Sequence, residues 1–134
     1  MTLADLMLLA AVLLTIATIG IAKATDVKGF DNARPRDPGF YQDPFRARAL
    51  AAHQNGFEVF PFLAAAVILA EMRHAPQAWV DGLAVAFILL RFAYVGAYLA
   101  DRPTMRSVVW GAGFACNLGI FFLPWWFARG AGGM

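Results

Sequence analysis

The stretch Arg46–Phe62 reads RARALAAHQNGFEVFPF and places strongly polar side chains inside an otherwise apolar segment. These side chains are Arg48, Asn55 and Glu58, and a fourth, Arg91, lies in the next apolar segment. A bilayer penalises such groups, by about 3 kcal/mol each at its centre on insertion scales, unless they find partners or water. The four residues therefore predict a polar pocket between membrane helices.

The composition around this stretch is typical of a membrane protein. Of the 134 residues, 60% are hydrophobic and 15% are charged, which is too apolar for a soluble domain of this size. Four apolar stretches each have about the 17–25 residues that a spanning helix needs, and strand-like alternation is absent. We predict an all-α integral membrane protein, a single four-helix bundle over residues 1–134, with helices at about 3–22, 44–72, 76–101 and 104–128.

The first span is expected to remain a helix of the bundle. Its end, Ala22-Lys23-Ala24, resembles a signal-peptide cleavage site. However, its start has no Lys or Arg and carries Asp5, which is unlike a signal peptide.

The distribution of Lys and Arg predicts the orientation of the bundle. Most cationic residues lie in the loop after the first span and its flank, or in the turn between the third and fourth spans. The opposite side has only Arg73 and Arg129. The positive-inside rule thus places the first loop and the last turn in the cytoplasm and both termini outside it. The net charge of +2 mostly reflects this bias and gives no reason to propose nucleic-acid binding.

The cysteine and the histidines argue against disulfide, zinc and haem sites, and we predict no metal. Cys116 is the single cysteine, so it is expected to pack within the fourth span. His53 and His74 lie 21 residues apart, about 30 Å along a continuous helix, so one subunit cannot use both as axial ligands of one haem. We expect His53 near the headgroup interface and His74 in a turn, both as solvated or capping residues.

The longest connection, Thr25–Asp43, is rich in Gly, Pro, Asp and Asn and predicts an irregular cytoplasmic loop. We favour a solvated linker. The alternative is a lid over the pocket, with Arg34 or Arg36 attracting an anion.

The polar residues of the second and third spans fall on one face of each helix. At about 100° per residue, spacings of seven and three gather the first set, and spacings of three and four gather the second. The two sets are Arg48, Asn55 and Glu58, and Arg91, Tyr94 and Tyr98.

Glu58 and Arg91 lie at similar depth, so we predict a buried ion pair between them. In the simplest interpretation this pair only holds two helices together. The tyrosines, Asn55 and Arg48, stacked toward the cytoplasm, would also suit a polar, anionic, peptide-like ligand.

These residues resemble the MAPEG family, the membrane-associated proteins in eicosanoid and glutathione metabolism, in a bacterial-type member. The family pattern is roughly R-A-x-x-A-x-x-N-x-x-E-x-x-P on the second helix and R-x-x-Y-x-x-x-Y on the third, with an arginine at the start of the fourth. The chain matches it with Arg48, Ala49, Ala52, Asn55, Glu58, Pro61, Arg91, Tyr94, Tyr98 and Arg106.

The resemblance implies a homotrimer in the bacterial inner membrane, with glutathione as co-substrate bound between neighbouring subunits. Arg48, Asn55, Glu58, Arg91, Tyr94 and Tyr98 would hold the tripeptide. Arg106 would stabilise its thiolate, because a guanidinium favours the thiolate without taking up the proton itself. The lipid-facing side would admit a small hydrophobic substrate, an apolar electrophile or a lipid hydroperoxide, for transferase or peroxidase chemistry.

The chain departs from the family pattern at one position. Glutathione-using members often carry an arginine four residues before the asparagine, where this chain has Ala51. Arg34 or Arg36 could substitute for that arginine, and Arg102 is a second candidate for the thiol. A non-catalytic or non-glutathione small-molecule binder on the same scaffold therefore remains the alternative, with a purely structural oligomer as a third possibility.

Overall fold

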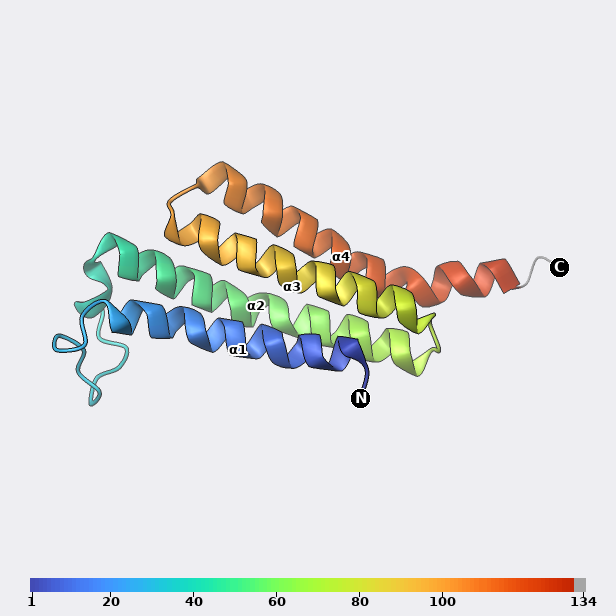
Figure 1. Cartoon of the computed structure of the whole chain (residues 1–134), viewed down its shortest axis with the longest axis horizontal. Helices are drawn as coiled ribbons and strands as arrows, with labels where there is room; N and C mark the ends of the chain where they lie inside the picture. Colours follow the sequence, from blue (N-terminus) through green and yellow to red (C-terminus); the bar gives the residue numbers. More distant parts are fainter. Residues whose placement is uncertain (132–134) are drawn as a thin grey trace.

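Four long helices run antiparallel along one axis, as Figure 1 shows. The computed structural model describes residues 1–131, with side chains through residue 128. The helices are α1 (Leu3–Ala24), α2 (Pro44–Met72), α3 (Gln77–Leu99) and α4 (Pro103–Ala131), and a short 3-10 helix, η1 (Phe40–Gln42), precedes α2. Where their ends differ from the predicted ends, they differ by one to three residues, which is within the usual uncertainty of helix boundaries.

Local sequence explains where α1 and α2 begin. Thr2 and Asp5 form a capping box at the start of α1. At the start of α2, the Asp43 carboxylate accepts hydrogen bonds from the backbone N–H groups of Phe45 and Arg46, and Pro44 occupies the first helical position.

The two tight turns lie just after α2 and α3. His74 and Asp101 each have φ of 56°, in the left-handed region that stops a helix. His74 therefore lies in a turn, as the sequence predicted.

The two middle helices hold the bundle together. Both α2 and α3 contact each of the other helices, whereas α1 and α4 do not contact each other over the described residues. Leu63 and Val67 of α2, Val80 of α3 and Ile120 of α4 are fully buried between them. Cys116 packs against this core, as expected. Polar residues on α2 and α3 can therefore contact side chains from more helices than polar residues on α1 or α4 can.

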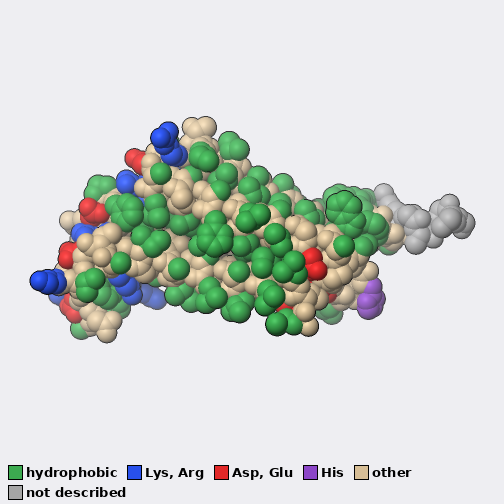
Figure 2. All heavy atoms as spheres, in the orientation of Figure 1, with side chains coloured by type: hydrophobic (Ala, Val, Ile, Leu, Met, Phe, Trp, Pro, Cys, Tyr) green, Lys and Arg blue, Asp and Glu red, His purple; other side chains and the backbone are tan. Residues whose placement is uncertain are grey.

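The surface is apolar along the length of the bundle and cationic at one end. Figure 2 shows hydrophobic side chains over the middle of the molecule, with Lys and Arg gathered at the end that carries the 25–43 loop and the α3–α4 turn. Within the described part of the chain, four helices are long and apolar enough to cross a membrane. The two segments predicted to be cytoplasmic thus lie at the same end of the molecule.

The 25–43 connection is irregular, as predicted, and folds back on itself. The Tyr41 hydroxyl donates to the Pro35 carbonyl at 3.2 Å, and Phe30 packs edge-on against Phe40. The Arg46 guanidinium donates to the Phe40 carbonyl at 2.6 Å and lies over its ring. The loop is therefore fixed to the start of α2.

Candidate functional site

Arg91 is held by Asn55 rather than by Glu58, so the predicted ion pair is wrong. Arg91 is 6% exposed, and its Nη1 donates to Asn55 Oδ1 at 3.0 Å. Asn55 Nδ2 in turn donates to Glu58 Oε2 at 3.1 Å. Within the described residues, Glu58 makes no ion pair with Arg91, and its side chain is exposed. The amide lies between the two charges because Glu58 projects from the outer surface of α2, away from the bundle interior.

Two arginines and two tyrosines alternate along the next part of the site. The Arg91 guanidinium carbon lies 4.1 Å from the centre of the Tyr94 ring, and that of Arg106 lies 4.5 Å from the Tyr98 ring. The two rings meet edge to face with centres 5.5 Å apart. Cation–π contacts of this kind stabilise arginines in apolar surroundings. Arg106 of α4 therefore continues the row of polar and aromatic side chains that was predicted along one face of α3.

A cleft of about 150 Å³ opens beside these side chains, between α2, α3 and α4. Asn55, Tyr94 and Arg106 line it, together with Ser107 and Trp110. The Ser107 hydroxyl already donates to the Pro103 carbonyl, 3.1 Å away. The structure thus brings three of the predicted site residues to one cleft. Tyr98 contacts it through Arg106, and Glu58 through Asn55.

Arg48 lies closer to the cationic end of the molecule than this cleft. Its Nη1 lies 3.8 Å from Asp101 Oδ2, in the turn between α3 and α4. Its Nε is buried and has no hydrogen-bond partner among the residues with described side chains. Arg48 therefore links the start of α2 to the last turn and retains one free donor.

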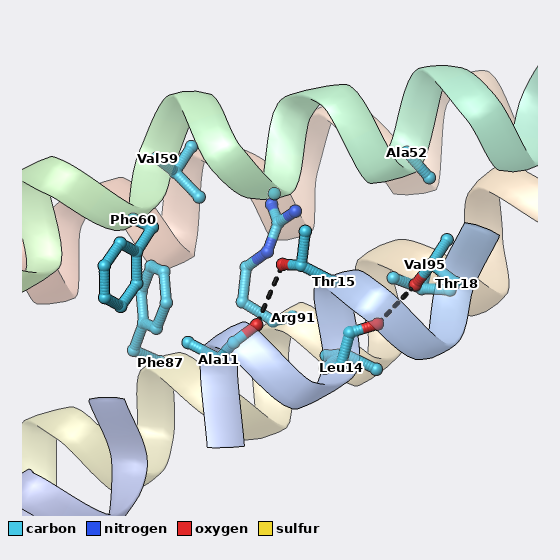
Figure 3. Close-up of a pocket in the computed structure, with 11 residues that line it drawn as sticks. Ala11, Leu14, Thr15, Thr18, Ala52, Val59, Phe60, Phe87, Arg91 and Val95 are labelled. Atoms are coloured by element: carbon cyan, nitrogen blue, oxygen red, sulfur yellow. Dashed lines mark hydrogen bonds between the residues drawn. The ribbon is translucent and has the colours of Figure 1, made fainter. Parts of the chain in front are cut away.

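Arg91 also faces α1 through a small cavity, drawn in Figure 3. The hydroxyls of Thr15 and Thr18 on α1 line this cavity, and each donates to its own helix, to the carbonyls of Ala11 and Leu14 at 2.8 and 2.7 Å. Figure 3 shows the Arg91 side chain reaching from α3 toward α2, past Thr15. The arginine therefore lies at the centre of the bundle.

His53 joins α2 to α1, which corrects the expectation of a solvated or capping residue. Its Nδ1 lies 2.7 Å from the carbonyl oxygen of Thr15, and its ring packs edge-on against Phe57. His74 lies in the turn at the other end of α2, so the two histidines are far apart as predicted. No cluster of metal-binding side chains occurs among the described residues.

The loop arginines do not line the cleft. Arg34 pairs with Asp31 at 3.1 Å and is largely exposed. Arg36 lines a second cavity of about 570 Å³, with Lys23 and His53. Neither arginine lines the cleft of its own chain, so the loop is not a lid over it.

Sequence reasoning missed Ser107 and Trp110 in the cleft and Asn117 in the interior. Asn117 is 4% exposed and faces Arg91 across a small cavity. Helical spacing could have found Trp110, since it follows Arg106 by four residues. Asn117 could have been noticed as the one amide in the fourth apolar span.

Four spanning helices around a buried arginine and a polar cleft define a helical integral membrane protein with a candidate small-molecule site. Comparison with known families gives the particular class: the family model described as the MAPEG family matches residues 2–126. The chain therefore belongs to the MAPEG family. Searches among curated proteins and among solved structures gave no match.

Proposed function

We propose that this protein is a glutathione-dependent membrane transferase or peroxidase that acts on apolar electrophiles or lipid hydroperoxides. The observation that carries the proposal is the cleft in which Asn55, Tyr94 and Arg106 meet. A thiol is a poor nucleophile while protonated, and a neighbouring cation lowers its pKa and favours the thiolate. Arg106 supplies that cation, and its guanidinium has only donors, so it can face the thiolate without competing for its proton.

Four residues of the cleft have a role in this proposal. Asn55 and Tyr94 offer amide and hydroxyl groups to the polar tripeptide, while Arg106 faces its thiolate. Trp110 forms the apolar wall, and it stacks on Phe114 with ring centres 5.5 Å apart and planes 9° apart. Both rings belong to the membrane-spanning part of α4, so an apolar second substrate can approach from the lipid.

The size of the cleft supports a site shared between subunits. Small-molecule sites usually enclose about 300–1,000 Å³, and this cleft has about 150 Å³ within one chain. A neighbouring subunit would supply the missing wall. Gly82, Gly96 and Gly111 are exposed and have open space above them, which allows close helix approach. The homotrimer itself follows from the family resemblance, and a mass measurement in nanodiscs tests it.

The orientation belongs to the same proposal. The cationic end of the bundle would face the cytoplasm of a bacterial inner membrane, with both termini outside it. Glutathione would then reach the cleft from the cytoplasmic side, where Arg48 and the α3–α4 turn lie. Cysteine labelling from either side of intact vesicles, with single cysteines placed in the 25–43 loop and the α2–α3 turn, tests this orientation.

Turnover tests the proposed chemistry. Purified protein in lipid should conjugate glutathione to an aryl halide or reduce a lipid hydroperoxide. Arg106→Ala should remove most of this activity while Arg102→Ala retains it, because Arg102 is exposed and does not line the cleft. The reverse ranking would assign the thiol to Arg102, and no turnover in the parent would refute the enzyme.

Ala51 favours a second candidate, a non-catalytic or non-glutathione binder on the same scaffold. It stands where glutathione-using members often carry an arginine, and neither Arg34 nor Arg36 lines the cleft of its own chain. Tight ligand binding without any turnover would favour this candidate over the enzyme.

A further inference from the structure

Asn117 is a buried amide whose acceptor has no partner. The residue lies on α4 and is 4% exposed, and its Oδ1 is buried without a hydrogen bond from any residue whose side chain is described. Buried acceptors are nearly always satisfied, because leaving one unpaired costs the free energy of its lost hydration. Something other than the described protein groups is therefore expected to donate to this oxygen.

The oxygen belongs to a side chain that lines a cavity with Arg91. About 10 Å³ of this cavity is open to the centre of a water molecule, which is about the smallest space that holds a single water. Apart from Asn117 and Arg91, its walls are mainly apolar, with Val59, Phe87 and Phe114 among them. A guanidinium has only donors and an amide oxygen only accepts, so a water between them can accept from one and donate to the other.

The cavity on the α1 side of Arg91 gives a useful contrast. It has similar room, but the Thr15 and Thr18 hydroxyls at its wall already donate to their own helix. Only the Asn117 side combines a water-sized space, a cation and an unpaired buried acceptor.

The same arginine also contacts a residue of the cleft. Arg91 donates to Asn55 at 3.0 Å, and Asn55 lines the cleft. Trp110 lines both the Asn117 cavity and the cleft, so it forms the wall between them. Any group that fixes the guanidinium from the α4 side therefore also fixes the amide that the cleft presents to a ligand.

We propose that Asn117 and Arg91 hold one internal water molecule, and that Asn117 acts through this water as a positioning residue for Arg91 and Asn55. The chain of contacts then runs from Asn117 on α4 through water and Arg91 on α3 to Asn55 and Glu58 on α2. The hydration site does not depend on the proposed enzyme activity. Only its effect on glutathione rests on that proposal.

A high-resolution structure of the full chain in lipid tests the hydration site directly. The parent map should show one peak within hydrogen-bond distance of Asn117 Oδ1 and the Arg91 guanidinium. Asn117→Leu, which is close in size and has no acceptor, should lose the peak and lengthen the Arg91–Asn55 contact. A parent map that resolves other internal waters but shows none here would overturn the site.

Glutathione binding tests the positioning role. Asn117→Leu should weaken it by about two- to thirtyfold, the effect that residues acting through a neighbour can have on coupling, and raise KM more than it lowers kcat. Ile120→Val, a core change on α4 away from this cavity, should leave the affinity unchanged.

The outcomes separate the two proposals. Unchanged glutathione affinity in Asn117→Leu would overturn the positioning role. If the parent itself binds no glutathione, the proposed function fails, and the Arg91–Asn55 distance in the Asn117→Leu map then decides whether Asn117 positions Arg91.

Discussion

Replacing Asn55 with leucine should destabilise the bundle far more than neutralising Glu58. Asn55→Leu removes the acceptor that lies 3.0 Å from Arg91 Nη1, and Arg91 is 6% exposed. Hydrogen bonds to charged groups contribute about 1.5–3 kcal/mol, and an unpaired buried cation adds to the loss. Leucine recovers little of this, because Asn55 is only half-buried. We expect a net loss of about 2–3 kcal/mol.

Glu58→Gln should cost less than about 0.5 kcal/mol, the usual scale of a surface substitution. Glu58 is exposed, and its contact is with the Asn55 amide, for which the glutamine side-chain oxygen is still an acceptor. A buried Glu58–Arg91 ion pair would instead lose about 3–5 kcal/mol when one partner is removed. The two variants therefore distinguish the observed contacts from the pair expected from sequence.

Equilibrium unfolding in mixed micelles, followed by tryptophan fluorescence, measures both free energies of unfolding. The double variant Asn55→Leu with Arg91→Met should recover part of the stability, because replacing both polar partners by apolar groups is often nearly neutral. An unfolding free energy for Glu58→Gln as low as that for Asn55→Leu would refute the reasoning.

Further predictions concern packing, helix capping and assembly. Gly56→Ala should be about 1–3 kcal/mol less stable than Gly20→Ala in the same unfolding assay. A Cβ at Gly56 would lie 2.7 Å from Thr15 Cγ2, whereas a Cβ at Gly20 would meet open space. Equal stabilities of the two variants would contradict this. The backbone N–H of Arg46 lowers the pKa of the Asp43 carboxyl from its ordinary value of 3.8, so the cap at the start of α2 is present above that value and is lost as the pH falls through the lowered pKa. Hydrogen-exchange protection of the first turn of α2 should fall over the same pH range. Protection that stays constant would argue against this. Native mass measurement in nanodiscs should give three chains, and only monomer or dimer would count against the trimer.

Hydropathy and residue spacing predicted the fold because each membrane span is visible in the sequence as a separate apolar stretch. The four apolar stretches set the helices, and the periodicity of Arg91, Tyr94 and Tyr98 placed them along one face. Charge position also placed the 25–43 loop and the last turn at one end. Helix position, the residues that share a helix face and the charge of a loop all depend on residues that are close together in the chain, and the sequence shows their order directly.

The contacts between helices could not be derived in the same way. Glu58 and Arg91 have matched depth, yet rotation of α2 turns Glu58 outward and puts Asn55 against the arginine. Gly56 lies against Thr15, and that close approach brings His53 within reach of the Thr15 carbonyl. Rotation about a helix axis is set by packing, so a spacing rule predicts which residues share a face but not which residue makes the contact.

Ultraviolet titration of the purified protein with glutathione tests the central claim most directly. At a pH where the thiol of free glutathione is largely protonated, the parent protein should develop thiolate absorbance that saturates as glutathione binds. Arg106→Ala should still bind glutathione but develop that absorbance only at higher pH, while Arg102→Ala should match the parent. Bound glutathione without thiolate absorbance in the parent, or the same pH dependence in Arg106→Ala, would contradict the account.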